Sequence, residues 1–191
     1  KVLGADTARG VLAEQADVQP GQRVLEIGCG TGSLLVLLKQ RQPGAEIIGL
    51  DPDTAALDIG RRKARRAGLS VRLDNGFADE LPYPDGTFDR VLSSFMFHHL
   101  SRSVKEATLA EVRRVLKPGG RFHMVDFAGP GSGHRGFIAR HVHTNQHLRD
   151  NDEAPVLDML HGAGLTDAQV VARRSSQLGG MVYYTAVSPS P

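Results

Sequence analysis

The chain has 191 residues, 40% of them hydrophobic, which suits a single compact domain. No stretch of about eighteen apolar residues occurs, and residues 1–10 lack the apolar run of a signal peptide, so we expect a soluble cytoplasmic protein without a membrane span. The single cysteine, Cys29, cannot form an internal disulfide or build a structural zinc site by itself, in agreement with a reducing compartment.

The net charge of +2 is far below that of proteins that neutralise many phosphates, so nucleic-acid binding is not expected. Basic residues cluster at Arg61, Arg62, Lys63, Arg65 and Arg66, but on a helix they fall largely on one solvated face. The chain does not begin with methionine, and its first predicted helix starts abruptly. We therefore expect one domain over residues 1–191 with part of the natural N-terminus missing.

Hydrophobic periodicity and turn residues predict helices and strands in alternation. Residues 11–18 are predicted to be the end of a first helix, and further helices are predicted at 32–40, 54–67, 104–116 and 154–163. The predicted strands are 23–27, 45–50, 70–73, 88–93, 121–127, 169–173 and 181–187. Asp53 or Thr54 is expected to cap the third helix. Residues 128–150 break the pattern. The fold class is therefore α/β, a Rossmann-like seven-stranded, mainly parallel sheet with helices on both faces and the last strand antiparallel, paired with the preceding strand as a hairpin.

A glycine-rich turn follows the first predicted strand. Gly28, Gly30 and Gly32 occupy alternate positions where a side chain would block the approach of a ligand to the backbone. The third glycine comes one residue too early for a dinucleotide-binding fingerprint, and Glu26 precedes the first glycine by two residues. The pattern favours a ligand other than a dinucleotide, with a tight strand-to-helix turn as the structural alternative.

Asp51 ends the second predicted strand, which puts its carboxylate at the same edge of a parallel sheet as the glycine turn. There it can accept hydrogen bonds from both hydroxyls of a ribose. Capping of the next helix is the alternative role, for which Asp53 or Thr54 is better placed.

Five further segments follow in order, namely Leu50-Asp51, GFADELPY at 76–83, FDRV at 88–91, FHHL at 97–100 and EVRRVLKPGG at 111–120. With these segments the chain resembles the class I S-adenosylmethionine-dependent methyltransferases (methyltransferase type 11 domain), in particular the ubiquinone and menaquinone biosynthesis C-methyltransferases. The resemblance covers residues 20–127. It implies S-adenosylmethionine as cofactor, with Glu26 and the glycine backbone at its aminocarboxypropyl end, Asp51 at the ribose and Pro52 near the adenine.

The cofactor site expected from these arguments consists of Glu26, Gly28, Cys29, Gly30, Gly32, Asp51, Pro52, Phe77, Ala78 and Ser93. Phe77 stands where the family usually has an aspartate that accepts from the adenine amino group. It can instead pack on the adenine face while the Ala78 amide donates to the ring, or Asp74 or Asp79 can substitute. Cys29 is small enough for the turn and is expected to have no redox or nucleophilic role.

Histidines are the candidates for a general base, which is needed only if the acceptor must lose a proton. His98 and His99 follow the fourth predicted strand, and a structural role with a ring bonded to nearby backbone is the alternative for both. A second group, His134, His141, His143 and His147, lies in the segment where the family generally builds its acceptor pocket. His143 and His147 have helical metal-ligand spacing, but no third ligand is evident and no metal site is expected.

The resulting hypothesis is transfer of a methyl group from S-adenosylmethionine to a small-molecule acceptor, giving S-adenosylhomocysteine. The absence of a segment like Asn-Pro-Pro-Tyr at 93–96 argues against nucleic-acid bases as acceptors, and the acceptor pocket is expected at 95–100, at 127–148 and at the N-terminal helix. Two alternatives are an inactive or weakly active S-adenosylmethionine-binding module and an NAD-dependent oxidoreductase. The acceptor atom and the oligomeric state are left open.

Overall fold

A computed structural model describes residues 4–129, 150–176 and 179–190 of the chain. Its helices are α1 (Ala5–Ala16), α2 (Ser33–Arg41), α3 (Thr54–Arg66), α4 (Arg102–Val115) and α7 (Glu153–Gly162), with a short 3₁₀ helix η1 (Phe97–His99). Its strands are β1 (Arg23–Ile27), β2 (Glu46–Asp51), β3 (Arg72–Asn75), β4 (Phe88–Ser94), β5 (Leu116–Phe127), β6 (Thr166–Ser176) and β7 (Gly179–Val187).

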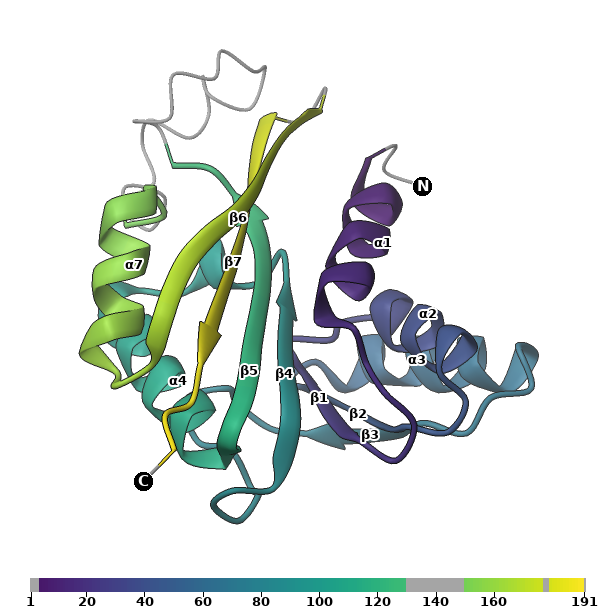
Figure 1. The fold of residues 1–191 in the computed structure, drawn as a ribbon. Coiled ribbons are helices and arrows are strands. Elements are labelled where there is room, and N and C mark those ends of the chain that lie inside the picture. Colours follow the sequence, from purple (N-terminus) through teal and green to yellow (C-terminus); the bar gives the residue numbers. More distant parts are fainter. Residues whose placement is uncertain (1–3, 130–149, 177–178, 191) are drawn as a thin grey trace.

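The seven strands form one sheet in the order β3-β2-β1-β4-β5-β7-β6 (Figure 1). Neighbouring strands from β3 to β5 are parallel, and β7 runs antiparallel to both β5 and β6. The predicted α/β class, the mainly parallel sheet and the final hairpin are therefore confirmed. The strand order reverses between β1 and β4, so the crevice beyond their carboxyl ends is where a ligand is expected to bind.

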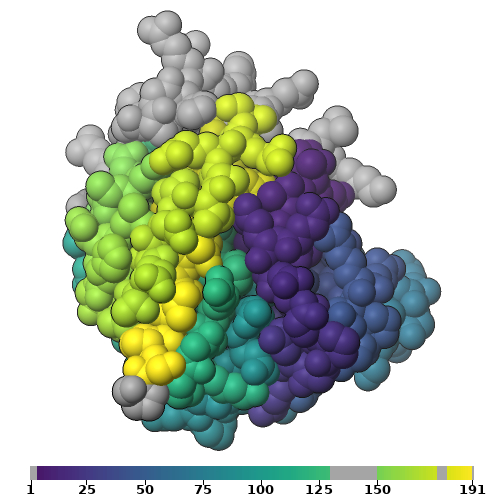
Figure 2. Space-filling view, in the orientation of Figure 1, coloured from purple at the N-terminus to yellow at the C-terminus, as the bar shows by residue number. Residues whose placement is uncertain are grey.

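Strand alternation divides the core between the two faces of this sheet. Leu25 and Ile27 of β1 pack in one buried cluster with side chains of α4 and α7, whereas Val24 packs in a second cluster with α1, α2 and α3. The two groups of helices accordingly lie on opposite sides of the sheet (Figure 1). In the space-filling view α1 lies between the β6–β7 hairpin and α2, and Tyr183 of β7 donates a hydrogen bond to the backbone of Ala8 (Figure 2).

Several predicted boundaries were wrong, and tertiary contacts explain the largest difference. Residues 117–120 were expected to lie between the helix 104–116 and the strand 121–127 but belong to β5, because Gly119 donates to Ser188 O and Ser188 donates to Gly120 O, both at 2.8 Å. Strand β3 lies two residues later than expected, and α1 ends at Ala16 rather than 18. Asp53, not Thr54, caps α3 by accepting from two backbone amides.

Most of the irregular segment predicted at 128–150 lies outside the described residues, including His134, His141, His143 and His147. The structure therefore neither supports nor contradicts their expected roles. Within the described ranges, no helix is both long and apolar enough to cross a membrane.

His123 of β5 is a buried polar residue that the sequence analysis did not single out. It is 4% exposed, and neither ring nitrogen has a hydrogen-bond partner among the described residues. Burial, followed by the nearby charges of Arg90 and Arg121, lowers the pKa of His123 to about 4. The folded protein therefore holds this ring in its neutral form.

This burial predicts an acid-sensitive fold. An unfolded histidine titrates near 6.5, so the stabilising difference is fully present above that pH and is lost as the pH falls towards 4, at a cost of about 3 kcal/mol in the free energy of unfolding. We expect His123→Leu to reduce the loss of stability between pH 7 and pH 4 by about this amount. Urea denaturation at several pH values measures the effect, and parallel pH dependences of the two proteins would contradict it.

Candidate functional site

The glycine turn after β1 has a left-handed backbone, which glycine adopts without a steric cost. Gly28, Gly30 and Gly32 adopt φ angles of 63°, 51° and 69°. A Cβ on Gly30 would meet no atom within 4 Å, whereas a Cβ on Gly28 would collide with Met96. Open space thus lies beside the middle of the turn, and Met96 brings the segment after β4 against its start.

Contacts with β2 and α3 hold the other residues of the turn in place. The Cys29 side chain is 5% exposed and is directed towards Gly49 of β2, where an added Cβ would lie 2.8 Å from the sulfur. Burial, then the charges of Glu26 and Asp51, raises the pKa of the Cys29 thiol far above its usual range. The buried thiol is held in its protonated form, which is a poor nucleophile. That Cys29 has no redox or nucleophilic role stays a prediction. Lys63 of α3 donates to Thr31 O at 2.7 Å and to Ser33 Oγ at 2.8 Å.

Glu26 is a buried carboxylate at the centre of the crevice. Its side chain is 1% exposed, Oε1 accepts a hydrogen bond from Ser94 Oγ at 3.0 Å, and Oε2 has no partner among the described residues. Burial raises the pKa of Glu26 to about 8, although the Ser94 hydrogen bond and the charge of Arg9 act in the opposite direction. A buried carboxylate with one unpaired oxygen is costly unless a cationic or hydrogen-bond-donating group completes it.

Arg9 of α1 lies near enough to Glu26 for its positive charge to act on this carboxyl group. Its guanidinium is 5.5 Å from the ring centroid of Phe95, which follows Ser94 and has a positive φ of 56°. Among the described residues, the ion pair of Arg9 is a 3.5 Å contact to the exposed Asp6. Helix α1 therefore brings a cation close to Glu26 and Phe95.

Asp51 lies at the end of β2, as the sequence predicts. Its Oδ2 accepts from the Gly30 amide at 2.7 Å and its Oδ1 from the Asp53 amide at 2.9 Å. Each oxygen retains a lone pair, so the carboxylate is oriented by the turn and can still accept from a ligand. Asn75 Nδ2 bonds Asp51 O at 3.1 Å and Pro52 O at 2.9 Å, which fixes the adjacent strand ends.

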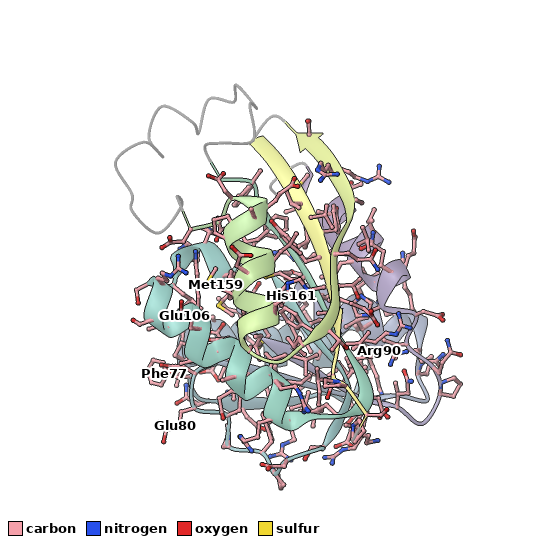
Figure 3. All side chains as sticks on the ribbon, turned by 60° about the vertical axis from the view of Figure 1, so that its left-hand side comes forward. Phe77, Glu80, Arg90, Glu106, Met159 and His161 are labelled. Atoms are coloured by element: carbon pink, nitrogen blue, oxygen red, sulfur yellow. The ribbon has the colours of Figure 1, made fainter. Side chains whose placement is uncertain are left out.

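The residues expected at the adenine lie at the rim of the same edge. Phe77 is 63% exposed and projects from the outside of the molecule (Figure 3), whereas Ala78 packs partly against the core. Of the two alternative acceptors, Asp74 is already bonded to Tyr83 Oη at 2.9 Å and to Arg72. Asp79 is exposed. An exposed aromatic face is therefore available for stacking on a planar base.

Together these residues suit a ligand that carries an ammonium group, a diol and a planar base. The unpaired Glu26 oxygen matches the first, the oriented Asp51 carboxylate matches the second, and Phe77 with Pro52 matches the third. Gly30, in the middle of the turn, leaves room for such a ligand because a Cβ there would meet no atom within 4 Å. No group of three potential metal ligands occurs in the described part of the chain.

The last two residues of β4 lie on opposite faces of the sheet. Ser94, which was not predicted, shares the face of Glu26, whereas Ser93 lies on the opposite face with a buried hydroxyl that has no partner among the described residues. His98 is mostly buried, and His99 beside it is exposed. Burial, then the charge of His98, lowers the pKa of His99.

Sequence reasoning missed Arg9, Ser94 and Asp126. Asp126 ends β5 and bonds His98, a contact between residues 28 positions apart that no local pattern reveals. Strand alternation could have identified Ser94, since it predicts that Ser94 rather than Ser93 shares the face of Glu26.

Because Glu26 is buried, with one oxygen that has no partner among the described residues, we expect it to lower the stability of the ligand-free fold while serving to bind a ligand. An unfolded glutamate titrates near 4.5, so ionisation of Glu26 favours unfolding progressively from pH 4.5 towards 8, by about 3 kcal/mol at pH 7. We expect ligand-free Glu26→Gln to be more stable than the wild type at pH 7 and equally stable near pH 4.5.

Urea denaturation at the two pH values measures this difference. Glu111→Gln is a matched control of opposite sign, because hydrogen bonds from Arg114 lower the pKa of Glu111, so its ionised form stabilises the fold. A Glu26→Gln protein that is less stable than the wild type at pH 7 would contradict the prediction.

Comparisons with known proteins agree with this geometry. Residues 24–120, more than half of the chain, match the family model described as Methyltransferase domain. The demethylmenaquinone methyltransferase of Thermus thermophilus is 43% identical over 119 residues, which are 62% of this chain and 53% of that protein. That of Deinococcus radiodurans is 40% identical over 139 residues, or 72% of this chain and 57% of that protein. The chain thus spans little more than half the length of these relatives.

A solved structure shares the fold. Phosphoethanolamine N-methyltransferase 2 of Haemonchus contortus, in complex with S-adenosyl-L-methionine, has a TM-score of 0.80 at 15% identity and covers 96% of this chain and 53% of that one. The family match includes the glycine turn, Asp51 and β4, which are the elements that form the crevice described above. The chain therefore belongs to the methyltransferase domain family.

Proposed function

We propose that this chain is a methyltransferase that transfers a methyl group from S-adenosylmethionine to a small-molecule acceptor. The observation that carries the proposal is Glu26, a buried carboxyl group whose Oε2 has no partner among the described residues, beside a glycine turn with open space at Gly30. The ammonium group of the cofactor supplies the partner that this carboxylate lacks. The family match and the complex of the Haemonchus contortus enzyme support the same cofactor.

Different residues of the site are proposed to bind different parts of the cofactor. Glu26 and the backbone of Gly28, Cys29, Gly30 and Gly32 hold its amino acid end, Asp51 accepts from the ribose, and Pro52, Phe77 and Ala78 lie at the adenine. Ser93, which is fully buried on the opposite face of β4, is assigned no contact with the cofactor. When bound, S-adenosylmethionine supplies an electrophilic methyl group on a positively charged sulfur. The protein aligns the acceptor with that group and excludes water, which can lower the barrier by about 7–11 kcal/mol.

The acceptor side is formed by the segment after β4, with His98 and His99 as candidate bases. The names of the two relatives make reduced demethylmenaquinone the first acceptor to test. A cytoplasmic location and the absence of nucleic-acid binding stay predictions from the sequence. Binding of the cofactor without turnover on any acceptor would favour the alternative of an inactive binding module.

Calorimetric titration with S-adenosylhomocysteine and with NAD tests the cofactor. We expect S-adenosylhomocysteine to bind and NAD not to bind. Asp51→Ala should weaken S-adenosylhomocysteine binding roughly tenfold to a hundredfold, because it removes a charge-assisted hydrogen bond worth about 1.5–3 kcal/mol.

Asp53→Ala is the matched control. It removes the side-chain cap of α3 two residues away, so it should cost about 1 kcal/mol of stability and leave the affinity unchanged. Equal losses in both variants would mean that Asp51 acts only through the local fold. Absence of S-adenosylhomocysteine binding in the wild type would overturn the proposed function.

Arg9 is expected to contact the carboxylate of the cofactor, because it lies over Phe95 and its charge acts on Glu26, which is expected to bind the neighbouring ammonium group. Arg9→Met should weaken S-adenosylhomocysteine binding by about tenfold or more. It should leave the affinity for 5′-methylthioadenosine unchanged, since that compound lacks both the amino and the carboxylate group. Calorimetry with the two ligands measures the difference.

Arg41→Met is the control that shows how much affinity is lost when α1 is merely displaced. Arg41 of α2 holds that helix through Gly10 O at 3.0 Å and Glu14 at 3.3 Å. A role of Arg9 in docking α1 alone would make both variants lose affinity for both ligands equally.

A further inference from the structure

A histidine and an aspartate from different strand ends form a closely bonded pair. His98 lies in η1 after β4, and Asp126 ends β5. His98 Nδ1 is 2.6 Å from Asp126 Oδ1, and the His98 backbone amide donates to Asp126 Oδ2 at 3.1 Å. Asp126 is 1% exposed and the His98 side chain 13%. Asp126 therefore holds His98 through both its backbone amide and its imidazole ring.

The hydrogen bonds to Asp126 determine which nitrogen of His98 carries the proton. Both carboxylate oxygens act as acceptors, since Oδ1 also accepts from the Phe127 amide at 2.6 Å. An aspartate carboxylate can only accept hydrogen bonds. His98 must then donate from Nδ1, which leaves Nε2 with a free lone pair in the neutral ring. Nε2 has no hydrogen bond within the described part of the chain.

Aromatic rings connect this pair to the cofactor turn and fix the ring plane. The His98 ring packs edge-on against Phe127 with centroids 5.1 Å apart, and Phe127 lies 5.1 Å from Phe95. Phe95 carries the Arg9 guanidinium on its face, beside Glu26. Met96, between Phe95 and η1, lies against Gly28. A row of ring contacts thus runs from the pair through Phe127 to Phe95, which carries Arg9, at the carboxyl ends of β4 and β5.

We propose that Asp126 is a positioning residue that holds His98 with Nε2 as the proton acceptor, and that the methyl acceptor is a compound whose nucleophile forms by loss of a hydroxyl proton. This inference rests on the proposed methyltransferase function. A preformed nucleophile such as a tertiary amine needs no base, so a buried carboxylate dedicated to one imidazole tautomer would have no task there.

The chemistry balances without a further reactant. Nε2 takes the hydroxyl proton of the acceptor, and His98 becomes a cation stabilised by Asp126. The electron pair left on oxygen, either directly or through a conjugated ring carbon, forms the bond to the methyl carbon. The pair of the broken sulfur–methyl bond stays on sulfur, which becomes neutral. His98 then releases its proton to water.

The experiment combines a spectroscopic readout with kinetics. Nitrogen-15 NMR of the ligand-free protein at pH 8, with the His98 signals assigned from His98→Gln, reports which nitrogen is protonated. The acceptors are reduced demethylmenaquinone and simple phenols of graded acidity. His98→Gln and Asp126→Asn are the test variants, with calorimetric binding of S-adenosylhomocysteine measured in each.

The wild type should show a proton on Nδ1 and none on Nε2, and Asp126→Asn should disturb this ratio. His98→Gln should lower kcat by about 10²- to 10⁴-fold, and Asp126→Asn by more than about tenfold, with the affinity for S-adenosylhomocysteine within about threefold of the wild type. Asp89→Asn is the matched control. It removes a carboxylate bonded to Lys117 at the other end of β4 and should change stability but not the His98 tautomer.

Three outcomes would overturn the inference. They are a proton on Nε2 of wild-type His98, a His98→Gln protein with wild-type kcat, and no turnover on any hydroxyl acceptor while S-adenosylhomocysteine still binds. Loss of S-adenosylhomocysteine binding in the wild type is a different result, because it overturns the proposed function itself.

Discussion

The reversal of strand order between β1 and β4 is the constraint on which the rest of the site depends. Helices leave the two strands towards opposite faces of the sheet, so the space beyond their carboxyl ends stays open. Glu26 near the end of β1 borders this space and bonds Ser94 at the end of β4. The remaining residues of the site are arranged around that one buried carboxylate.

Burial of Glu26 makes the ligand-free crevice energetically unfavourable as well as open. One carboxylate oxygen has no partner among the described residues, and the turn beside it uses three residues in left-handed backbone conformations. Glycine adopts such angles without a Cβ clash, although it loses more conformational entropy on folding. Local instability of this kind is common where a ligand completes the structure, since binding to the folded state alone adds to stability.

Two pairs of ionisable residues lie at the carboxyl edge of the sheet, with aromatic rings between them. Arg9 and Glu26 lie on the side of α1 and α2, and His98 with Asp126 lies on the side of α4 and α7. Phe95 and Phe127 lie between them. This arrangement keeps the carboxylate that binds the cofactor apart from the one that orients the imidazole, so each can act on one ligand.

The sequence by itself determined the order and type of the elements, the glycine turn and the place of Asp51, because these follow from local periodicity, backbone freedom and spacing. The start of β5 and the pairing of His98 with Asp126 depended on the tertiary structure, since both require contacts between residues distant in the chain. The same holds for Arg9, which the packing of α1 brings to Glu26. Burial and partners, which set the pKa of Glu26 and of His123, exist only once the sheet and its helices have assembled.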